Sequence, residues 1–236
     1  GVPIVNILPL EKDESVNAII AGRKDEKSKN LIFFTRNGLV KRTSITEFDS
    51  IRKNGKIAIS LKDDDELISV KVTGGNDEVM MASAAGRMVR FNENEVRVMG
   101  RSASGVKGID LGDSKVIGAE VVNKSELVLV VTENGYGKKT NVDEYRLTHR
   151  GSKGVKALNM TDKNGLMISL NCIDITESKH KDIMIVTDSG VIMRMPLDQI
   201  STLKRATQGV RLIHLKENQK VATVTVVDLE EEIGNE

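Results

Sequence analysis

The sequence lacks tryptophan, and aromatic residues make up only 3% of its 236 positions. This scarcity argues against the aromatic platforms on which single-strand-binding proteins stack bases. A single cysteine, Cys172, excludes an internal disulfide framework and a zinc site built from cysteines, and it fits a reducing cytoplasm. No apolar run approaches the roughly 20 residues of a membrane-spanning helix, and no signal-peptide pattern opens the chain. We therefore expect a cytoplasmic protein without a membrane partner.

Motifs of catalysis and metal binding are missing as well. The sequence contains no nucleophile elbow, P-loop or dinucleotide fingerprint. His149, His180 and His214 show no ligand spacing, and we interpret them as isolated surface or turn histidines. The run Asp63-Asp64-Asp65 lacks the rest of a calcium loop and is typical of a solvated turn. The sequence thus favours a non-catalytic protein that holds neither metal nor cofactor.

The net charge of +1 hides an uneven distribution. Residues 228–236 contain five acidic side chains and no basic one, which leaves +6 on residues 1–227. A mildly basic body with an acidic tail is compatible with binding to a polyanion.

A first signature occurs four times along the chain. It reads Thr35-Arg-Asn-Gly38-Leu-Val-Lys-Arg42 and returns as Ser83-Ala-Ala-Gly86-Arg-Met-Val-Arg90, Thr132-Glu-Asn-Gly135-Tyr-Gly-Lys-Lys139 and Thr187-Asp-Ser-Gly190-Val-Ile-Met-Arg194. A basic residue stands four positions after each glycine. The glycine predicts a tight hairpin turn, in which Asn37-Gly38 and Asn134-Gly135 favour positive φ.

A second signature alternates with the first. It reads Arg101-Ser-Ala-Ser-Gly105-Val-Lys107, Arg150-Gly-Ser-Lys-Gly154-Val-Lys156 and Arg205-Ala-Thr-Gln-Gly209-Val-Arg211, with a shortened form Arg52-Lys-Asn-Gly55-Lys56 and an opening Gly1-Val-Pro. Two independent markers in one order make a true internal repeat. We expect whole repeats at about 1–54, 55–104, 105–153 and 154–208, a half repeat at 209–229, and an acidic tail at 230–236.

Each repeat is typical of short β-strands. Alternating apolar residues follow the second-signature glycine, as is typical of a half-buried strand. A turn and a second strand, such as Leu67–Val72 or Leu166–Cys172, come next. Apolar runs typical of buried strands then precede the first signature, at Leu31–Phe34, Val79–Met81, Leu127–Val131 and Ile183–Val186. Four strands in about 50 residues predict propeller-like blades, and the half repeat suggests that neighbours share strands. Bulky residues six positions after the basic one are expected as packing anchors between repeats: Phe48, Val96, Tyr145 and Ile200.

The repeated basic residues predict a binding surface for duplex DNA. Equivalent positions place them on one side of the repeat array, and glycine-bearing turns bring backbone N–H groups close to phosphate. The predicted contacts are Lys41, Arg42, Arg52, Lys53, Arg90, Arg101, Lys107, Lys138, Lys139, Arg150, Lys153, Lys156, Arg194, Lys204, Arg205 and Arg211. Regular repetition of such turns suits a bent duplex held by its backbone. A protein-interaction propeller is the alternative, and an enzyme is a more distant one.

Several phrases resemble the C-terminal domain of the bacterial DNA gyrase A subunit, in the family's order and over residues 1–227. They are Gly1-Val-Pro-Ile-Val-Asn-Ile-Leu-Pro-Leu10, Arg52-Lys-Asn-Gly-Lys-Ile-Ala-Ile59, Thr132-Glu-Asn-Gly-Tyr-Gly-Lys-Lys-Thr140 and Thr207-Gln-Gly-Val-Arg-Leu-Ile213. The resemblance implies a β-pinwheel that bends duplex DNA around its basic edge. It also implies a holoenzyme built from the gyrase A and B subunits, whose active sites lie elsewhere and which supercoils DNA negatively in the bacterial cytoplasm.

One family feature is not intact in this sequence. Gyrase carries a box of the form Gln-Arg-Arg-Gly-Gly-Lys-Gly in its first blade, and the nearest match here is Thr148-His-Arg-Gly-Ser-Lys-Gly154 in a later repeat. We expect that the first blade precedes the residues present here. The C-terminal domain of the topoisomerase IV A subunit, which shares the fold without the full box, is the alternative family member.

Overall fold

The computed structural model describes residues 10, 12–20, 29–50, 55–122, 126–176 and 181–228. Within these ranges the chain forms β-strands and short 3-10 helices and no α-helix. No helix in the described part is long and apolar enough to cross a membrane. The predicted all-β class is therefore confirmed.

The strands form four antiparallel sheets, which we call sheets A to D. Sheet A has the order β3 (Leu67–Thr73), β1 (Asn30–Thr35), β2 (Leu39–Ser44) and β6 (Val106–Lys107). Sheet B has the order β7 (Val116–Val122), β4 (Glu78–Ser83), β5 (Arg87–Asn92) and β10 (Val155–Lys156). Sheet C has the order β11 (Met167–Asp174), β8 (Glu126–Thr132), β9 (Tyr136–Asn141) and β14 (Val210–Arg211). Sheet D contains β15 (Val221–Asp228), β12 (Lys181–Thr187) and β13 (Ile192–Pro196).

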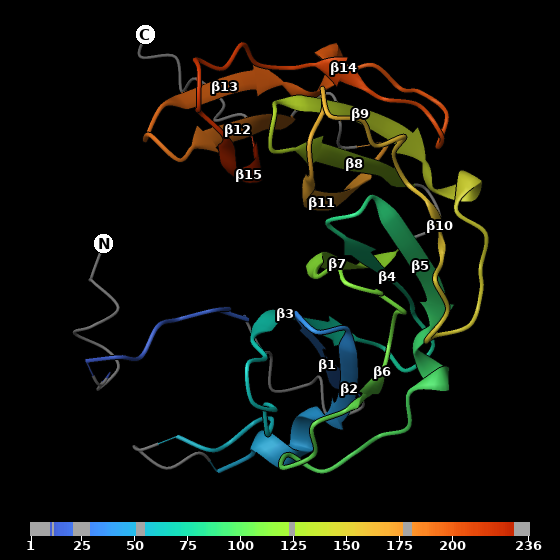
Figure 1. The fold of residues 1–236 in the computed structure, drawn as a ribbon. Coiled ribbons are helices and arrows are strands. Elements are labelled where there is room, and N and C mark those ends of the chain that lie inside the picture. The colour runs from blue at the N-terminus through green and yellow to red at the C-terminus, as the bar shows by residue number, and fades with distance from the viewer. Residues whose placement is uncertain are drawn as a thin grey trace, which may run out of the picture.

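Strand exchange joins the sheets, as the sequence predicts. β6 follows the β4–β5 hairpin of sheet B along the chain but pairs with β2 of sheet A, and β10 and β14 return in the same way to sheets B and C. The exchanged strands carry the Gly-Val-Lys or Gly-Val-Arg part of the second signature. Figure 1 shows the four sheets following one another along an arc, with these returning segments on its outer side.

The first signature forms the hairpin turn of each sheet. Gly38 has φ +88° and its N–H donates to the Thr35 carbonyl, while Asn37 does not take positive φ. The Thr35 hydroxyl accepts a hydrogen bond from the N–H of Leu39 at 3.1 Å. Equivalent bonds to the Ser83, Thr132 and Thr187 hydroxyls occur in the other three hairpins. The Ser or Thr at the first position of the signature therefore stabilises the hairpin turn by accepting a hydrogen bond from the backbone N–H of the residue after the glycine.

The hydrophobic core lies between neighbouring sheets. In β4, Met80 and Ala82 pack toward sheet C, whereas Val79 and Met81 pack toward sheet A. This explains why the run is apolar at every position rather than at alternate ones. The predicted anchors Val96, Tyr145 and Ile200 are 0%, 0% and 2% exposed and join the three inter-sheet clusters. Phe48 is half-buried, with its ring 6.4 Å from that of Phe33.

A 3-10 helix follows the second hairpin strand of every sheet. These helices are η2 (Ile45–Phe48), η3 (Glu93–Glu95), η4 (Val142–Glu144) and η6 (Leu197–Gln199). The side chains of Ser44, Asn92 and Asn141 cap the first three by accepting a backbone N–H two residues ahead. After η3, η4 and η6 the chain leaves its own hairpin and returns to the preceding sheet.

Candidate nucleic-acid interface

Three long connections join a 3-10 helix to the exchanged strand that follows it, on the outer side of the arc (Figure 1). We call them the first, second and third outer loops: residues 96–105, 145–154 and 200–209. Each loop lies on a strand of the preceding sheet and donates a backbone hydrogen bond to it; in the third loop the Ser201 carbonyl also accepts from the Lys139 N–H. The donors and acceptors are Met99 to Arg42, Thr148 to Arg90 and Leu203 to Lys139, at 2.7 to 2.8 Å. The loops therefore present their side chains from equivalent places on successive sheets.

The second-signature glycines approach protein backbone. A Cβ on Gly105 would lie 2.6 Å from the Val40 carbonyl oxygen, and one on Gly154 would lie 2.1 Å from that of Met88. Gly209 is similarly close to Gly137, at 2.9 Å. The sequence-based interpretation, in which these glycines bring the backbone close to a phosphate, is corrected. They allow each exchanged strand to lie against the preceding sheet.

Two first-signature lysines, both fully buried, hold outer loops from within. The Lys41 ammonium group donates to the carbonyl oxygens of Ala58 and Arg101. The Lys138 ammonium group donates to the carbonyls of Lys204, Arg205 and Thr207 in the third outer loop. Burial lowers the pKa of each lysine to about 8.

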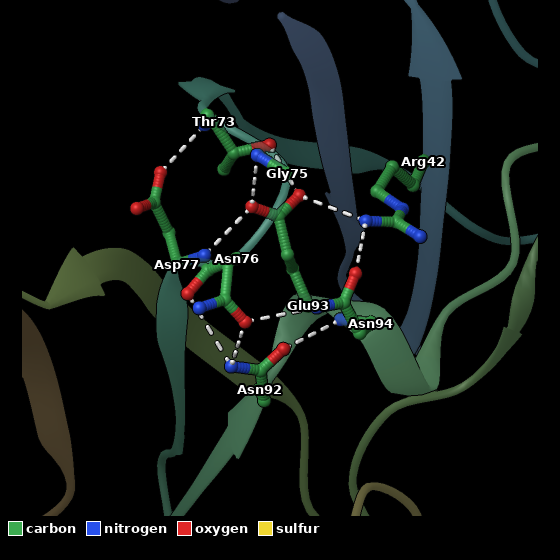
Figure 2. A network of polar contacts seen from close by, with 9 residues as sticks. Arg42, Thr73, Gly75, Asn76, Asp77, Asn92, Glu93 and Asn94 are labelled. Atoms are coloured by element: carbon green, nitrogen blue, oxygen red, sulfur yellow. Dashed lines mark hydrogen bonds and ion pairs between the residues drawn. The ribbon is translucent and has the colours of Figure 1, made fainter.

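Arg42 is bound to a buried carboxylate of the next sheet. Figure 2 shows Glu93 of η3 at the centre of a polar network, and its side chain is 0% exposed. Its carboxylate accepts from Arg42 Nη1 at 3.3 Å, from Thr73 Oγ1 at 2.6 Å and from the N–H groups of Gly75 and Asp77 at 2.8 Å. All these donors lie in sheet A or in the link to sheet B. The network therefore fixes sheet A against sheet B.

The equivalent cations of sheets B and C also contact the next 3-10 helix. Arg90 Nη1 donates to the carbonyls of Val142 and Tyr145 at 3.1 and 3.0 Å. Lys139 Nζ donates to the Leu197 carbonyl at 2.9 Å, and burial lowers its pKa. Arg194 differs, because its side chain is 45% exposed and pairs with Asp182.

The sequence predicts DNA contacts at Lys41, Arg42, Arg90, Lys138 and Lys139. The structure places the charged ends of these side chains against protein acceptors, and four of the five residues are at most 7% exposed. Consecutive residues on a strand point to opposite faces, so a Lys-Arg or Lys-Lys pair within a hairpin strand puts a cation on a covered face. We therefore leave these five residues out of the contact surface proposed below.

The second-signature arginines connect one outer segment to the next. Arg150 Nη1 donates to the Lys107 carbonyl at 3.0 Å, and Arg205 Nη1 donates to the Lys156 carbonyl. Arg101 makes the equivalent bond to the Ile57 carbonyl at 3.0 Å. Each acceptor stands two positions after a second-signature glycine. These half-buried arginines therefore tie the outer loops together while leaving part of each guanidinium at the surface.

Apart from Arg194 on β13, the predicted cations that are exposed lie on the outer loops and exchanged strands. They are Lys107, Lys153, Lys156, Lys204 and Arg211. Lys107 is ion-paired with Asp110 at 2.8 Å, which lowers the pKa of that carboxyl group, and Arg211 lies over the Tyr136 ring. Among the described residues, the ammonium groups of Lys153, Lys156 and Lys204 have no hydrogen-bond or ion-pair partner.

Two further exposed cations lie on the same loops and were not predicted. Arg97 and Arg146 follow the first-signature basic residue by seven positions in the first and second outer loops. The equivalent positions in the other two repeats are Asp49 and Ser201. This position is basic in only two of the four repeats, so a search for basic residues shared by all four repeats does not find it.

A hollow of about 510 Å³ opens beside the second outer loop. It is lined by Arg146, Thr148, His149 and Lys153, together with the backbone of Gly154. This is the segment that most resembles the seven-residue box. Arg52, Lys53 and the acidic tail 230–236 lie outside the described residues.

The chain matches the family model described as "DNA gyrase C-terminal domain, beta-propeller" over residues 29–73, 77–123, 126–174 and 181–228. The DNA gyrase A subunit of Halalkalibacterium halodurans is 51% identical over 233 residues, which cover 98% of this chain and 28% of that protein. The chain thus spans about a quarter of the length of the curated relatives it matches.

Two solved structures share the architecture. The C-terminal domain of DNA topoisomerase IV superposes with a TM-score of 0.87 at 28% identity, covering 97% of this chain and 71% of that one. A DNA gyrase A C-terminal domain superposes with a TM-score of 0.81 at 24% identity, covering 94% of this chain and 74% of that one. The β-pinwheel that the family resemblance implies is the fold of this protein.

Proposed function

Since the chain belongs to the DNA gyrase C-terminal domain family, we propose that it binds duplex DNA along its three outer loops and bends it. In this proposal the domain is non-catalytic. It presents a DNA segment to an ATP-dependent topoisomerase, formed in the bacterial cytoplasm by the gyrase A and B subunits, and so serves negative supercoiling.

The observation that carries the proposal is the position of the exposed cations. Lys153 and Lys204 lie on the second and third outer loops, and Lys156 lies on the exchanged strand β10; none of their ammonium groups has a protein partner among the described residues. Lys107 and Arg211 extend the series along the other exchanged strands. Cations that recur at equivalent places along an arc suit a duplex, whose phosphates also recur regularly. Neutralising phosphates on one side of that duplex helps to offset a bending cost of a few kcal/mol.

The same cations explain why we expect little sequence preference. Lysine ammonium groups contact phosphate as point charges, and the outer loops expose no aromatic side chain for stacking on bases. Binding of this kind is strongly salt-dependent and selects DNA mainly by its deformability.

Topoisomerase IV is the second candidate holoenzyme, and the structural superposition with its C-terminal domain favours it. The sequence comparisons favour gyrase, because several gyrase A subunits are 44% to 51% identical over 94% or more of this chain. Supercoiling assays with the reconstituted holoenzyme separate the two. Gyrase introduces negative supercoils, and loss of the outer-loop cations should reduce that activity while DNA relaxation persists.

The binding proposal is tested by a salt series with a duplex of about 40 base pairs. The double variant Lys153→Ala/Lys156→Ala should reduce the slope of log affinity against log salt by about two. Its matched control is Lys62→Ala/Lys216→Ala, which removes the same charge from exposed residues that belong to neither the outer loops nor the exchanged strands. Bending is measured in parallel by energy transfer between dyes on the two duplex ends.

Two results would overturn the proposal. If both double variants changed the slope equally, general charge rather than the outer loops would determine binding. If the wild-type chain showed no salt-dependent binding at all, a protein-interaction propeller would be the better description.

A further inference from the structure

The first-signature cations and the 3-10 helices form a repeated set of contacts that DNA contact does not explain. In each case the cation of one sheet reaches the 3-10 helix of the next sheet. Arg42 reaches Glu93 and Asn94 in η3, Arg90 reaches the Val142 and Tyr145 carbonyls at η4, and Lys139 reaches the Leu197 carbonyl in η6.

The opposite side of the same helices holds the loop of the following repeat. In η3, the Glu95 carboxylate oxygen Oε2 accepts a hydrogen bond from the Arg150 backbone N–H at 3.1 Å. The Glu95 backbone carbonyl accepts a second one from Arg150 Nε at 2.9 Å. Glu144 of η4 accepts the Arg205 backbone N–H through Oε2 at 2.7 Å. Each acid stands five positions after a first-signature cation.

The two sets of contacts join into one path. From Arg90 on β5 the path runs to η4, then through Glu144 to Arg205 in the third outer loop. The Arg205 guanidinium then donates to the Lys156 carbonyl on β10, which is paired with β5. The third outer loop is therefore held by Glu144 and by the Lys156 carbonyl, and both contacts lead to β5, the strand that carries Arg90. A parallel path runs from Arg42 through Glu95 to Arg150 and back to β6 on sheet A.

We propose that Arg42 and Arg90 are positioning residues: each sets the orientation of the outer loop two repeats further along the chain, through the 3-10 helix between them. The orientations of successive outer loops are consequently coupled, and the curvature of the surface formed by their exposed cations depends on these contacts between sheets. This rests on the proposed function, because it assigns those loops to DNA, but its first test needs no DNA.

That test is hydrogen exchange on the free chain with Arg90→Met. The reporter is the Arg205 amide, which donates to Glu144 and lies in a loop that Arg90 does not contact. Loss of the charge-assisted bonds at η4 should speed exchange of this amide about tenfold or more. Exchange of the Met99 amide, in the first outer loop, should stay unchanged.

Three matched variants separate positioning from simple destabilisation. Arg90→Lys should restore slow exchange, because a lysine already makes the equivalent carbonyl bond at Lys139. Arg194→Met removes the equivalent cation of sheet D, whose described partner is Asp182, and should leave Arg205 unaffected. Glu78→Gln removes the ion-pair partner of Arg90 and should also leave Arg205 unaffected.

The DNA readout follows with Glu144→Ala, which breaks the same path at an exposed residue and keeps Arg90 in place. We expect a smaller end-to-end bend at saturating protein, with the salt slope within about one of the wild-type value, because no outer-loop cation is removed. If Arg90→Met speeds exchange only around η4, or if Arg90→Lys does not rescue it, the positioning role is overturned. Failure of the proposed function gives a different pattern: exchange changes as expected, and none of the variants binds DNA.

Discussion

Replacing Gly154 by alanine should detach an exchanged strand, and Gly55 supplies the control. Both glycines occupy the same place in the second signature, with φ +64° and +75°. At Gly154 an added Cβ would lie 2.1 Å from the Met88 carbonyl oxygen and 2.9 Å from the Val89 nitrogen, whereas at Gly55 it would meet nothing within 4 Å. The two substitutions therefore share the backbone penalty and differ in the collision.

The magnitude follows from these contacts. An alanine in the left-handed region costs about 1 kcal/mol at either site, and the loss of freedom in the unfolded chain is the same for both. At Gly154 the collision also forces β10 away from β5. That movement breaks the Val155–Met88 and Lys156–Arg87 register and the 3.1 Å bond from Arg87 to the Gly154 carbonyl. With two to three hydrogen bonds at about 1 kcal/mol each, we expect about 3–4 kcal/mol for Gly154→Ala.

Urea unfolding of the two variants side by side measures the difference. Gly154→Ala should lower the free energy of unfolding by at least about 2 kcal/mol more than Gly55→Ala, at a similar dependence on denaturant. It should also weaken DNA binding, because Lys153 and Lys156 flank the glycine. Equal losses of stability in the two variants, to within about 0.5 kcal/mol, would refute the docking role of the second-signature glycine.

Three further outcomes are expected. Burial lowers the pKa of Lys138 to about 8, so between about pH 8 and 10.5 the unfolded chain binds more protons than the folded chain. In urea titrations at pH 7.5 and 10.5, the free energy of unfolding of the wild type minus that of Lys138→Met should therefore increase with pH; a decrease would mean that the carbonyl dipoles outweigh burial. Glu93→Ala should cost about 3–5 kcal/mol in the same assay, because it removes the carboxylate that pairs with Arg42 and leaves the Thr73 hydroxyl and the N–H groups of Gly75 and Asp77 without that acceptor; a loss below about 1 kcal/mol would show that the Arg42–Glu93 pair acts like a surface ion pair. Cys172, whose thiol pKa is raised by burial, should resist alkylation in the folded chain and react on unfolding; rapid labelling of the native protein would contradict the packing of β11.

The sequence predicts much of the fold because the repeat constrains local chemistry and periodicity together. The apolar run at Val79–Met81 becomes the buried strand β4, and Tyr145 becomes an anchor between sheets. Strand exchange is predictable too, since the half repeat at 209–229 indicates that neighbouring repeats share strands. The partner of each exchanged strand is not predictable, because a two-residue strand such as Val106–Lys107 has no pattern that selects β2 over its own sheet.

The candidate site is harder to predict from the sequence, and Lys41 and Lys138 show why. A lysine next to a second cation on a short strand is usually assigned to solvent, since an unpaired buried ammonium is costly. Here the cost is reduced by carbonyl oxygens that include those of Arg101, 60 positions from Lys41, and Thr207, 69 positions from Lys138. Such acceptors come from strand exchange, so their presence is known only once the topology is known.

Recurrence within a repeat therefore separates two kinds of basic residue. At Arg42 and Arg90 the cation recurs because its side chain contacts the 3-10 helix of the next sheet. A basic residue that recurs for this reason says nothing about ligands. The position two residues after the second-signature glycine is different, because the contact that recurs there is made by its carbonyl, which accepts from the next loop's arginine in the three described cases Ile57, Lys107 and Lys156. The fold tolerates Ile57 there, yet the other described repeats place exposed Lys107, Lys156 and Arg211. A charge that recurs where packing does not demand it is best explained by something outside the protein. Lys156 is therefore the strongest of the three candidates for a phosphate contact, because its ammonium group has no partner among the described residues, whereas Lys107 pairs with Asp110 and Arg211 donates to the Tyr136 hydroxyl.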